Sequence, residues 1–309
     1  MKNPITSLDP NLASLIVEKG NKECGNTALE YSSTYIYQLN NHINEVCSLS
    51  TSEIEEKINY LVGCLTITLD LPMSKLEFLR VRRCEGKNFG HAHELSYIKE
   101  TTICFPVQGR MNQVGQSLFY AALAVKKDDS ALRVALSEAR SKNLDHSNVL
   151  RSDQKNGVDL NIRVIGIWDA IRRNCKPYYL GNDIFDYYTK ASNLMEKNFD
   201  SNLLHAYQLT DRFFSDVLSR KGSINLYQVT SIISSVILAG KVCDGILYSS
   251  VEAKGEPVIA LKPSSVNRAL AHQMVEDIRV EKHIGYEFYK YRIKTKTKGI
   301  DRSTGKLNW

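Results

Sequence analysis

The residues best suited to bind an anion lie in a short polar turn. Arg110 stands between two glycines, in the run Gly109-Arg-Met-Asn-Gln-Val-Gly115. An arginine guanidinium offers a planar set of donors that matches phosphate or carboxylate, and glycines let a backbone approach a ligand closely. The apolar run 117–124 follows at once and carries Tyr120, an aromatic side chain able to reach a pocket. The turn indicates an anion site or, equally well on its own residues, a loop whose arginine only pairs on the surface.

Two further arginines, Arg80 and Arg82, lie on a predicted strand over residues 76–82. Alternate residues of a strand point to the same face, so these two side chains are expected to lie together. With Arg110 they form a set of cations able to hold a pyrophosphate through charge-assisted hydrogen bonds. The alternative is that the arginines of this strand only pair with nearby acids.

A carboxylate that could act beside these cations is Glu138, in the run Ala135-Leu-Ser-Glu-Ala139. Its apolar neighbours predict partial burial, and partly buried acids are either paired or functional. On spacing alone, a solvated glutamate on a helix over 130–140 remains the alternative. A strand that starts near Asp244 runs directly into Ser249 and Ser250. Strand ends commonly carry ligand contacts, although serines are also routine in turns.

The distribution of charge argues against a body that binds nucleic acid. The 309-residue chain carries +6, of which residues 281–309 contribute +5 through eight Lys/Arg and three acids. The remainder is close to neutral, unlike the basic surface of nucleic-acid-binding proteins. Residues 291–300 alternate with period two, which predicts an edge strand whose lysines prevent pairing with another sheet. Contact between this tail and nucleic acid is the alternative.

The composition is that of an ordinary globular protein. Hydrophobic residues make up 43% of the chain and charged residues 24%, both usual for that class. The apolar runs are too short for a membrane span, and the first residues lack the pattern of a secretion signal. The seven cysteines are scattered without the spacing of a zinc site. We therefore expect reduced thiols, no metal, no membrane association and a cytoplasmic location.

Hydrophobic spacing predicts helices first and a mixed part afterwards. It predicts a helix over 27–48, and a capping box at Ser50–Glu53 starts a second helix over 52–62. From Lys75 onward strands and helices alternate irregularly, which favours a mixed α+β fold over a doubly wound parallel sheet. We expect a helical N-terminal extension over 1–70 and a main domain over 71–309 that ends in a basic strand or tail. Later elements are expected as strands over 160–168, 243–248, 256–262 and 284–298, and as helices over 130–140, 181–196, 203–219, 225–239 and 264–278.

Four segments, in order, resemble the RES family, named after its arginine, glutamate and serine. They are Phe78-Leu-Arg-Val-Arg82, Gly109-Arg-Met-Asn-x-x-Gly115 with Leu118-Phe-Tyr120, Ala135-Leu-Ser-Glu-Ala-Arg140, and Asp244-Gly-Ile-x-Tyr-x-Ser250. Their order over about 175 residues is more specific than any one of them. RES proteins resemble ADP-ribosyltransferases in fold. The resemblance therefore implies a mixed, mainly antiparallel sheet core in an NAD-binding catalytic domain over 71–309, and it does not extend to residues 1–70 or to the tail after about 265.

The resemblance also implies a site. Arg80 matches the arginine that would bind substrate phosphate, Tyr120 the tyrosine that would position nicotinamide, and Glu138 the glutamate that would stabilise the ribosyl cation. The remaining expected binding residues are Arg82, Gly109, Arg110, Asn112, Tyr227, Gln228 and Ser250. The distance from Tyr120 to Glu138 exceeds the family's usual spacing, and residues 125–129 look like a turn insertion. Some members use a different serine on a helix, for which segment 227–231 is the equivalent here, with Gln228 at the aligned position.

The function that the resemblance implies is cleavage of NAD+. The expected reaction is phosphorolysis to ADP-ribose-1″-phosphate and nicotinamide, with inorganic phosphate as co-substrate and no cofactor. Several RES proteins are toxins held in check by a helix-turn-helix antitoxin, so a toxin with such a partner is expected. The alternatives are an ADP-ribosyltransferase that modifies a protein or nucleic acid, and an inactive RES-like interaction module. If the chain self-associates, a homodimer is the commonest assembly.

Overall fold

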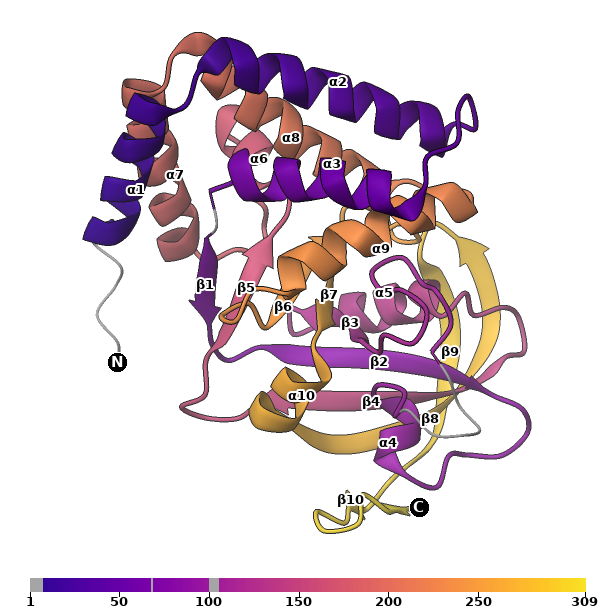
Figure 1. Cartoon of the computed structure of the whole chain (residues 1–309). Coiled ribbons are helices and arrows are strands. Elements are labelled where there is room, and N and C mark those ends of the chain that lie inside the picture. Colours follow the sequence, from indigo (N-terminus) through magenta and orange to yellow (C-terminus); the bar gives the residue numbers. More distant parts are fainter. Residues whose placement is uncertain (1–7, 68, 100–105) are drawn as a thin grey trace. The chain divides into compact units, whose positions relative to one another are not determined.

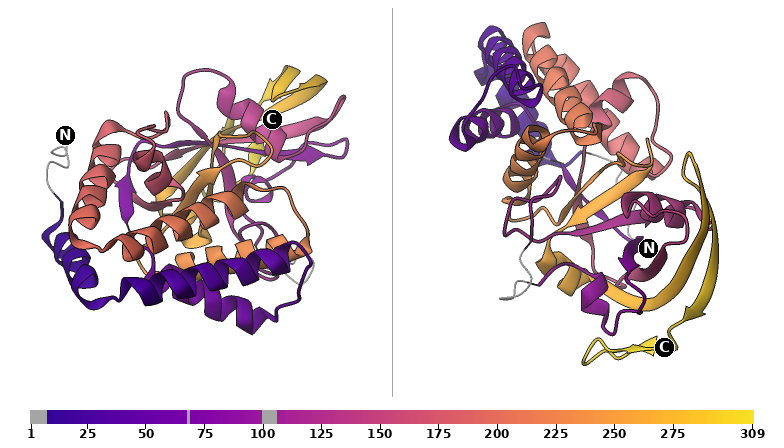
Figure 2. Two further views of the ribbon diagram at one scale, coloured as in Figure 1. Left: turned by 90° about the horizontal axis from the view of Figure 1, so that it is seen from above. Right: turned by 90° about the vertical axis from the view of Figure 1, so that its right-hand side faces the viewer.

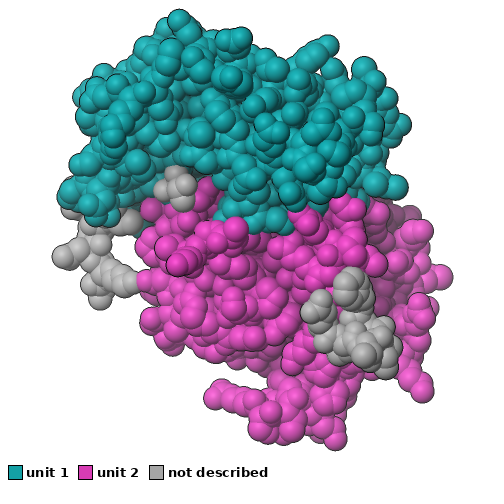
Figure 3. Space-filling model, in the orientation of Figure 1, with its two compact units in different colours: residues 1–69, 164–237 teal, residues 70–163, 238–309 magenta. Residues whose placement is uncertain are grey.

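The computed structural model describes residues 8–67, 69–99 and 106–309. The chain divides into two compact units, each drawn from two separate stretches of sequence (Figure 3). Unit 1 comprises residues 1–69 and 164–237, and unit 2 comprises residues 70–163 and 238–309. The helical extension expected over 1–70 ends where the first stretch of unit 1 ends. Residues 164–237, which we assigned to the main domain, group with that extension instead.

Unit 1 is helical in its described part. Its helices are α1 (Pro10–Lys22), α2 (Gly25–Ile43), α3 (Thr51–Cys64), α6 (Ile167–Arg172), α7 (Asn182–Asn198), α8 (Ser201–Ser219) and α9 (Ile224–Leu238). Helix α2 packs along α8, and α1 packs along α7 (Figure 1). The predicted capping box is present, because Glu53 N–H donates to Ser50 Oγ at 3.3 Å and Ser50 N–H donates to Glu53 Oε2 at 2.8 Å. This reciprocal pair fixes the start of α3.

Unit 2 is built on a nine-stranded sheet with the strand order β1-β5-β6-β7-β3-β2-β4-β8-β9. Its strands are β1 (Asp70–Met73), β2 (Glu77–Cys84), β3 (Phe119–Ala124), β4 (His146–Gln154), β5 (Leu160–Val164), β6 (Gly245–Ser249), β7 (Pro257–Leu261), β8 (Leu270–Gly285) and β9 (Phe288–Lys296). The sheet is mainly antiparallel, which confirms the predicted α+β class. The shorter elements of this unit are α4 (Ala92–Leu95), α5 (Ser130–Glu138), α10 (Pro263–Ala269), β10 (Gly299–Ile300) and β11 (Leu307–Asn308). Figure 2 shows the long β8–β9 ribbon curving along this unit.

The central strands β2 and β3 part soon after they meet. They pair only through residues 77–79 of β2, whereas β2 pairs with β4 along its whole length and β3 pairs with β7 over residues 119–122. Beyond Leu79 each strand therefore follows its other neighbour. Arg80, the next residue of β2, consequently lies beside a gap in the β2–β3 ladder.

Two predicted elements end earlier than their sequence pattern indicated. The helix expected over 264–278 stops at Ala269, and β8 begins at Leu270 because residues 270–279 pair with β4. The strand expected over 160–168 ends at Val164, and α6 starts after Gly166, whose φ of +80° turns the chain. Strand β4 has no counterpart among the predicted elements. The basic segment of period two does form an edge strand, as predicted, because β9 is last in the sheet order.

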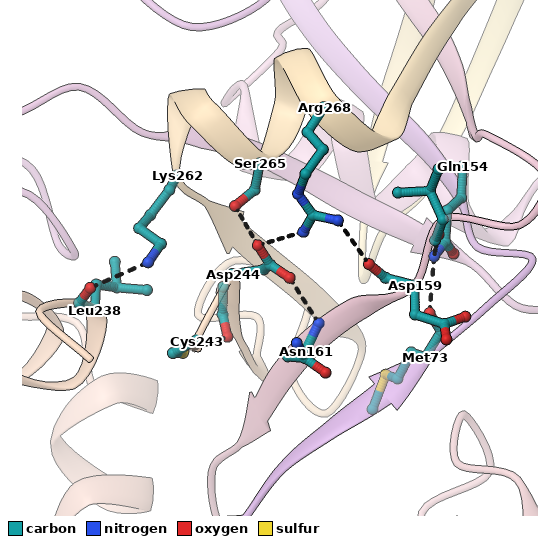
Figure 4. Close-up of polar contacts among 12 residues, drawn as sticks. Met73, Gln154, Asp159, Asn161, Leu238, Cys243, Asp244, Lys262, Ser265 and Arg268 are labelled. Carbon is teal, nitrogen blue, oxygen red and sulfur yellow. Dashed lines mark hydrogen bonds and ion pairs between the residues drawn. The ribbon is translucent and has the colours of Figure 1, made fainter. Parts of the chain in front are cut away.

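The carboxylate of Asp244 ties the start of β6 to two other elements (Figure 4). Its Oδ1 accepts hydrogen bonds from Ser265 Oγ and Arg268 Nη2 of α10, both at 2.6 Å. Its Oδ2 accepts one from the backbone N–H of Asn161 on β5 at 2.8 Å. Burial alone would raise the pKa of Asp244, but these donors hold it below its ordinary value. The first residue of the closing sequence block is thus a structural anchor.

No helix within residues 8–67, 69–99 and 106–309 is both long and apolar enough to cross a bilayer. No cluster of three or more His, Cys, Asp or Glu side chains in them could hold a metal ion. Six of the cysteines lie in these ranges and are free thiols, while Cys104 lies outside the described residues.

Candidate active site

Where β2 and β3 part, unit 2 holds a pocket of about 250 Å³. Its lining comes from β2, β3, β6, β7 and α5, and it includes Arg80, Tyr120, Glu138 and Tyr248. The structure therefore brings together the three residues expected to be catalytic, although they come from three separate elements. Pockets that enclose a drug-sized ligand measure about 300–1,000 Å³. A pocket of this size accommodates the end of a larger molecule.

Arg80 is a cation without an acidic partner in the part of the chain that the structure describes. Its Nη1 donates to the carbonyl of Tyr120 at 2.6 Å, and its guanidinium lies over the Phe119 ring at 5.6 Å. Its Nε is enclosed and has no hydrogen-bond partner. Burial, together with the nearby charge of Arg82, lowers the pKa of Arg80 to about 9, so the side chain stays charged at neutral pH. Since a buried charge is costly unless it is compensated, this site is suited to an anionic ligand.

Glu138 is held at the pocket by Ser250. Ser250 Oγ donates to Glu138 Oε1 and accepts a hydrogen bond from Ala253 N–H at 2.8 Å. The residue as a whole is exposed at the end of α5, yet the protein around its carboxyl group raises the pKa of Glu138 by desolvation. Ser250 and Arg110 oppose that rise, and the charge of Glu252 adds to it. The arrangement holds one carboxylate oxygen of a pocket-lining glutamate by a serine hydroxyl, and the backbone N–H of Glu252 also favours its ionised form.

Replacing Ser250 by alanine is expected to raise the pKa of Glu138 further. The hydroxyl donates to the carboxylate and so favours the ionised form, and its removal makes protonation easier. The measurement is a carboxyl ¹³C NMR titration of protein labelled at glutamate. Ser249→Ala, which removes a hydroxyl one residue earlier, should leave the titration of Glu138 unchanged. An unchanged midpoint in Ser250→Ala would show that this hydrogen bond does not govern the carboxylate.

The glycine turn is a scaffold for the pocket. The Tyr120 hydroxyl donates to Asn112 Oδ1 at 2.7 Å and accepts from Met111 N–H at 3.2 Å. The amide of Asn112 donates to the carbonyls of Val107 at 2.8 Å and Gln113 at 3.0 Å. A Cβ at Gly109 would lie 2.5 Å from Asn112 Oδ1, which explains the glycine there. The predicted supporting role of this turn therefore has a physical basis, and the Tyr120 hydroxyl belongs to it while the side chain lines the pocket.

Tyr120→Phe is expected to lower the free energy of unfolding by about 1–2 kcal/mol, the range for a buried hydrogen bond whose partners are left unsatisfied. The buried Asn112 Oδ1 would lose its donor, and Met111 N–H its acceptor. Urea denaturation measures the difference. Tyr286→Phe is the matched control, since Tyr286 is 90% exposed and its hydroxyl should contribute nothing. Equal stability of the two variants would contradict the scaffold role.

The other expected binding residues fall into two groups. Arg82 acts on the pKa of Arg80, and Arg110 acts on those of Glu138 and Tyr120, so both charges reach the pocket. Tyr227 and Gln228 lie on α9 of unit 1. Gln228 is engaged inside that unit, because its Nε2 donates to Thr51 Oγ1 at 3.2 Å and its Oε1 lies 3.3 Å from His42 Nε2. Its contacts are therefore those of a residue that joins helices of unit 1.

Tyr248 is a pocket residue that the sequence reasoning missed. It is buried on β6 and lines the pocket, and none of the hydrogen bonds among the described residues uses its hydroxyl. Burial and the charge of Glu138 raise its pKa well above the ordinary value, so the hydroxyl remains a proton donor. The signal that could have found it is its place in the closing block, two residues before Ser250 in Asp244-Gly-Ile-x-Tyr-x-Ser250.

No protein-family model, curated protein or solved structure matches this chain. Its function must therefore be inferred from its own side chains. The polar side chains that line the pocket of unit 2 are an arginine, a carboxylate held by a serine, and two tyrosines. Among the described residues, the arginine forms no ion pair with an acid.

Proposed function

We propose that this chain is an NAD+-cleaving enzyme of the RES type, which breaks the N-glycosidic bond to nicotinamide by phosphorolysis. The observation that carries the proposal is a pocket lined both by Arg80, a cation with no acid beside it among the described residues, and by Glu138, a carboxylate fixed by Ser250. NAD+ presents the complementary charges, a pyrophosphate and a cationic nicotinamide ribose. The proposed products are ADP-ribose-1″-phosphate and nicotinamide.

The chemistry needs little beyond these groups. When the C1″–N bond breaks, its electron pair leaves with the ring nitrogen, and the nicotinamide departs neutral without a general acid. The ribose becomes oxocarbenium-like, and a nearby carboxylate stabilises the developing positive charge. A phosphate oxygen then forms the new bond to C1″. Glu138 would supply the charge, Arg80 would bind and orient the pyrophosphate, and Tyr120 and Tyr248 would border the nicotinamide ribose.

The second anion, inorganic phosphate, needs its own cation, and Arg110 and Arg82 are the candidates. Arg110→Ala is expected to raise the KM for phosphate more than the KM for NAD+. Because Arg110 also lowers the pKa of Glu138, the comparison belongs at a pH well above the acid limb of the rate profile. Arg83→Ala, an exposed neighbour on β2, is the control. An unchanged KM for phosphate would remove Arg110 from this role.

The test of the proposed function is the loss of NAD+ in the presence of purified protein, with and without phosphate. Loss that requires phosphate and yields a phosphorylated ADP-ribose supports phosphorolysis. Loss that instead leaves labelled ADP-ribose on a protein or nucleic acid would establish the alternative, an ADP-ribosyltransferase. No loss in either condition, and no toxicity on expression, would leave an interaction module. As part of the same proposal, the enzyme acts as a toxin in the cytoplasm, with a helix-turn-helix antitoxin as its partner.

A further inference from the structure

A second and larger pocket of unit 2 lies along a part of the sheet edge that β9 leaves unpaired and that β10 approaches. Strand β8 pairs with β4 over residues 270–279, whereas β9 covers its other side only from Glu276 onward. Within the described ranges, residues 270–274 therefore have a strand neighbour on one side alone. A groove of about 810 Å³ runs along this stretch, between β8 and residues 299–305. A bare strand edge of this kind is a template for pairing with another chain.

The far wall of the groove is held in place by backbone bonds. Ala92 N–H donates to the carbonyl of Gly305 at 2.9 Å, and Leu307 N–H donates to that of Gly90 at 2.8 Å. The Trp309 indole donates to the carbonyl of Phe89 at 2.9 Å. These bonds fasten the β10–β11 hairpin to the segment around α4. The groove is thus formed before any ligand enters it.

One polar group in the groove lining has no partner among the described residues. Ser96 is 4% exposed, and its enclosed hydroxyl makes no hydrogen bond within the described ranges. Buried hydroxyls are normally satisfied. Its position in the lining fits a groove that is completed by a ligand.

The charges around the groove are mainly positive. Lys99, Lys155 and Arg302 line it, and the Lys155 ammonium is fixed by the carbonyls of Asn267 at 3.0 Å and Arg268 at 3.2 Å. Asp301, the acid among the described lining residues, is exposed, and its Oδ1 accepts hydrogen bonds within its own turn, including one from Ser303 Oγ at 2.6 Å. The groove consequently favours negatively charged side chains.

We infer that this groove binds an extended acidic peptide segment of another protein, which adds to the 270–274 edge of β8 as a further strand. Strand addition supplies affinity through main-chain hydrogen bonds and selectivity through side-chain contacts. This edge carries a bulge at Gln273, and its four residues that pair with β4 span about 13 Å at ~3.3 Å each, a length that suits a short peptide better than a single small anion. The three cations would then select Asp and Glu along it. This site is independent of the proposed NAD+ pocket.

Selection from a bead-displayed library of random eight-residue peptides, using the full chain, tests the inference. We expect the retained peptides to be rich in Asp and Glu and poor in proline. Binding of a selected peptide should slow amide hydrogen exchange in residues 270–274. Resynthesis with alternate N-methylated amides should weaken binding about tenfold or more, since it removes main-chain donors without changing charge.

Charge-reversal variants separate this site from the rest of the basic surface. Lys99→Glu with Arg302→Glu should weaken a selected peptide about tenfold. Lys282→Glu with Lys294→Glu, at exposed positions of the β8–β9 ribbon, should not. The inference is overturned if no acidic peptides are retained, if they bind without protecting 270–274, or if inorganic phosphate or pyrophosphate binds there and peptides do not.

Discussion

Glu138→Gln is expected to lower the rate of NAD+ cleavage by about 10²–10³-fold, the usual cost of removing a group that stabilises transition-state charge. Glutamine keeps the shape of the side chain and can still accept the hydrogen bond from Ser250. The fold should therefore be unchanged, and the loss should lie in kcat rather than in the KM for NAD+. The measurement is steady-state kinetics at saturating phosphate, with thermal unfolding as the check on folding.

Glu252→Gln is the matched control for this variant. Glu252 is the neighbouring carboxylate, it is held by Arg140 Nε at 3.1 Å, and its charge raises the pKa of Glu138. Its neutralisation should leave the rate at neutral pH intact. It should also move the acid limb of the rate profile to lower pH, because Glu138 would then remain ionised further into acid. Full activity in Glu138→Gln would refute the catalytic role of this carboxylate.

Arg80→Met is expected to change activity and stability in opposite directions. Loss of the proposed charge-assisted contact to the pyrophosphate should lower kcat/KM for NAD+ by roughly 10–10²-fold, which corresponds to about 1.5–3 kcal/mol for a hydrogen bond to a charged group. The free energy of unfolding should rise by about 1 kcal/mol, because a desolvated charge with no acid beside it among the described residues is replaced by an apolar side chain. The hydrogen bond that Arg80 donates to the Tyr120 carbonyl lies at the pocket, where water can replace it.

The two readouts together make the Arg80 prediction specific. Kinetics gives the first, and urea denaturation of the same preparation gives the second. Arg163→Met is the contrasting variant, since Arg163 is buried against Asp70 at 2.8 Å and its removal should destabilise the protein. A loss of stability in Arg80→Met similar to that in Arg163→Met would mean that Arg80 serves the fold rather than a ligand.

Local signals in the sequence predicted several elements correctly. The Ser50–Glu53 capping box, the helix that carries Glu138 and the basic edge strand β9 all follow from short-range patterns of cap, apolar stripe and period-two charge. The glycine turn was also visible, because Gly109 and Asn112 perform their task within one loop. These features depend on neighbours in the chain, which a single sequence contains.

Features that depend on contacts between residues far apart in the sequence could not be predicted from such local patterns. The apolar residues in segment 270–278 have a spacing that also suits a helix. The segment forms a strand because it pairs with β4. Strand β4 lacks the usual hydrophobic pattern of a buried strand, because three of its buried residues are polar: Ser147, Asn148 and Ser152. The resemblance placed Ser250 in the same site as Glu138, but their hydrogen bond was not predicted, because the two residues are 112 positions apart and only the return of β6 to the pocket brings them together.

The division of each unit between two stretches of sequence has a consequence for biosynthesis. Helix α2 leaves the ribosome early, but α8, the helix it packs along, follows only after the whole of unit 2's first stretch and after α6 and α7. At roughly 5–20 residues per second this interval lasts about 10–35 s. During that time the apolar side chains of α2, such as Ile36, Leu39 and Ile43, have no α8 to cover them. We therefore expect α2 to lack this packing partner for a large part of synthesis, and the proposed active site to assemble late in translation, once Ser250 has followed β6 and can donate to Glu138.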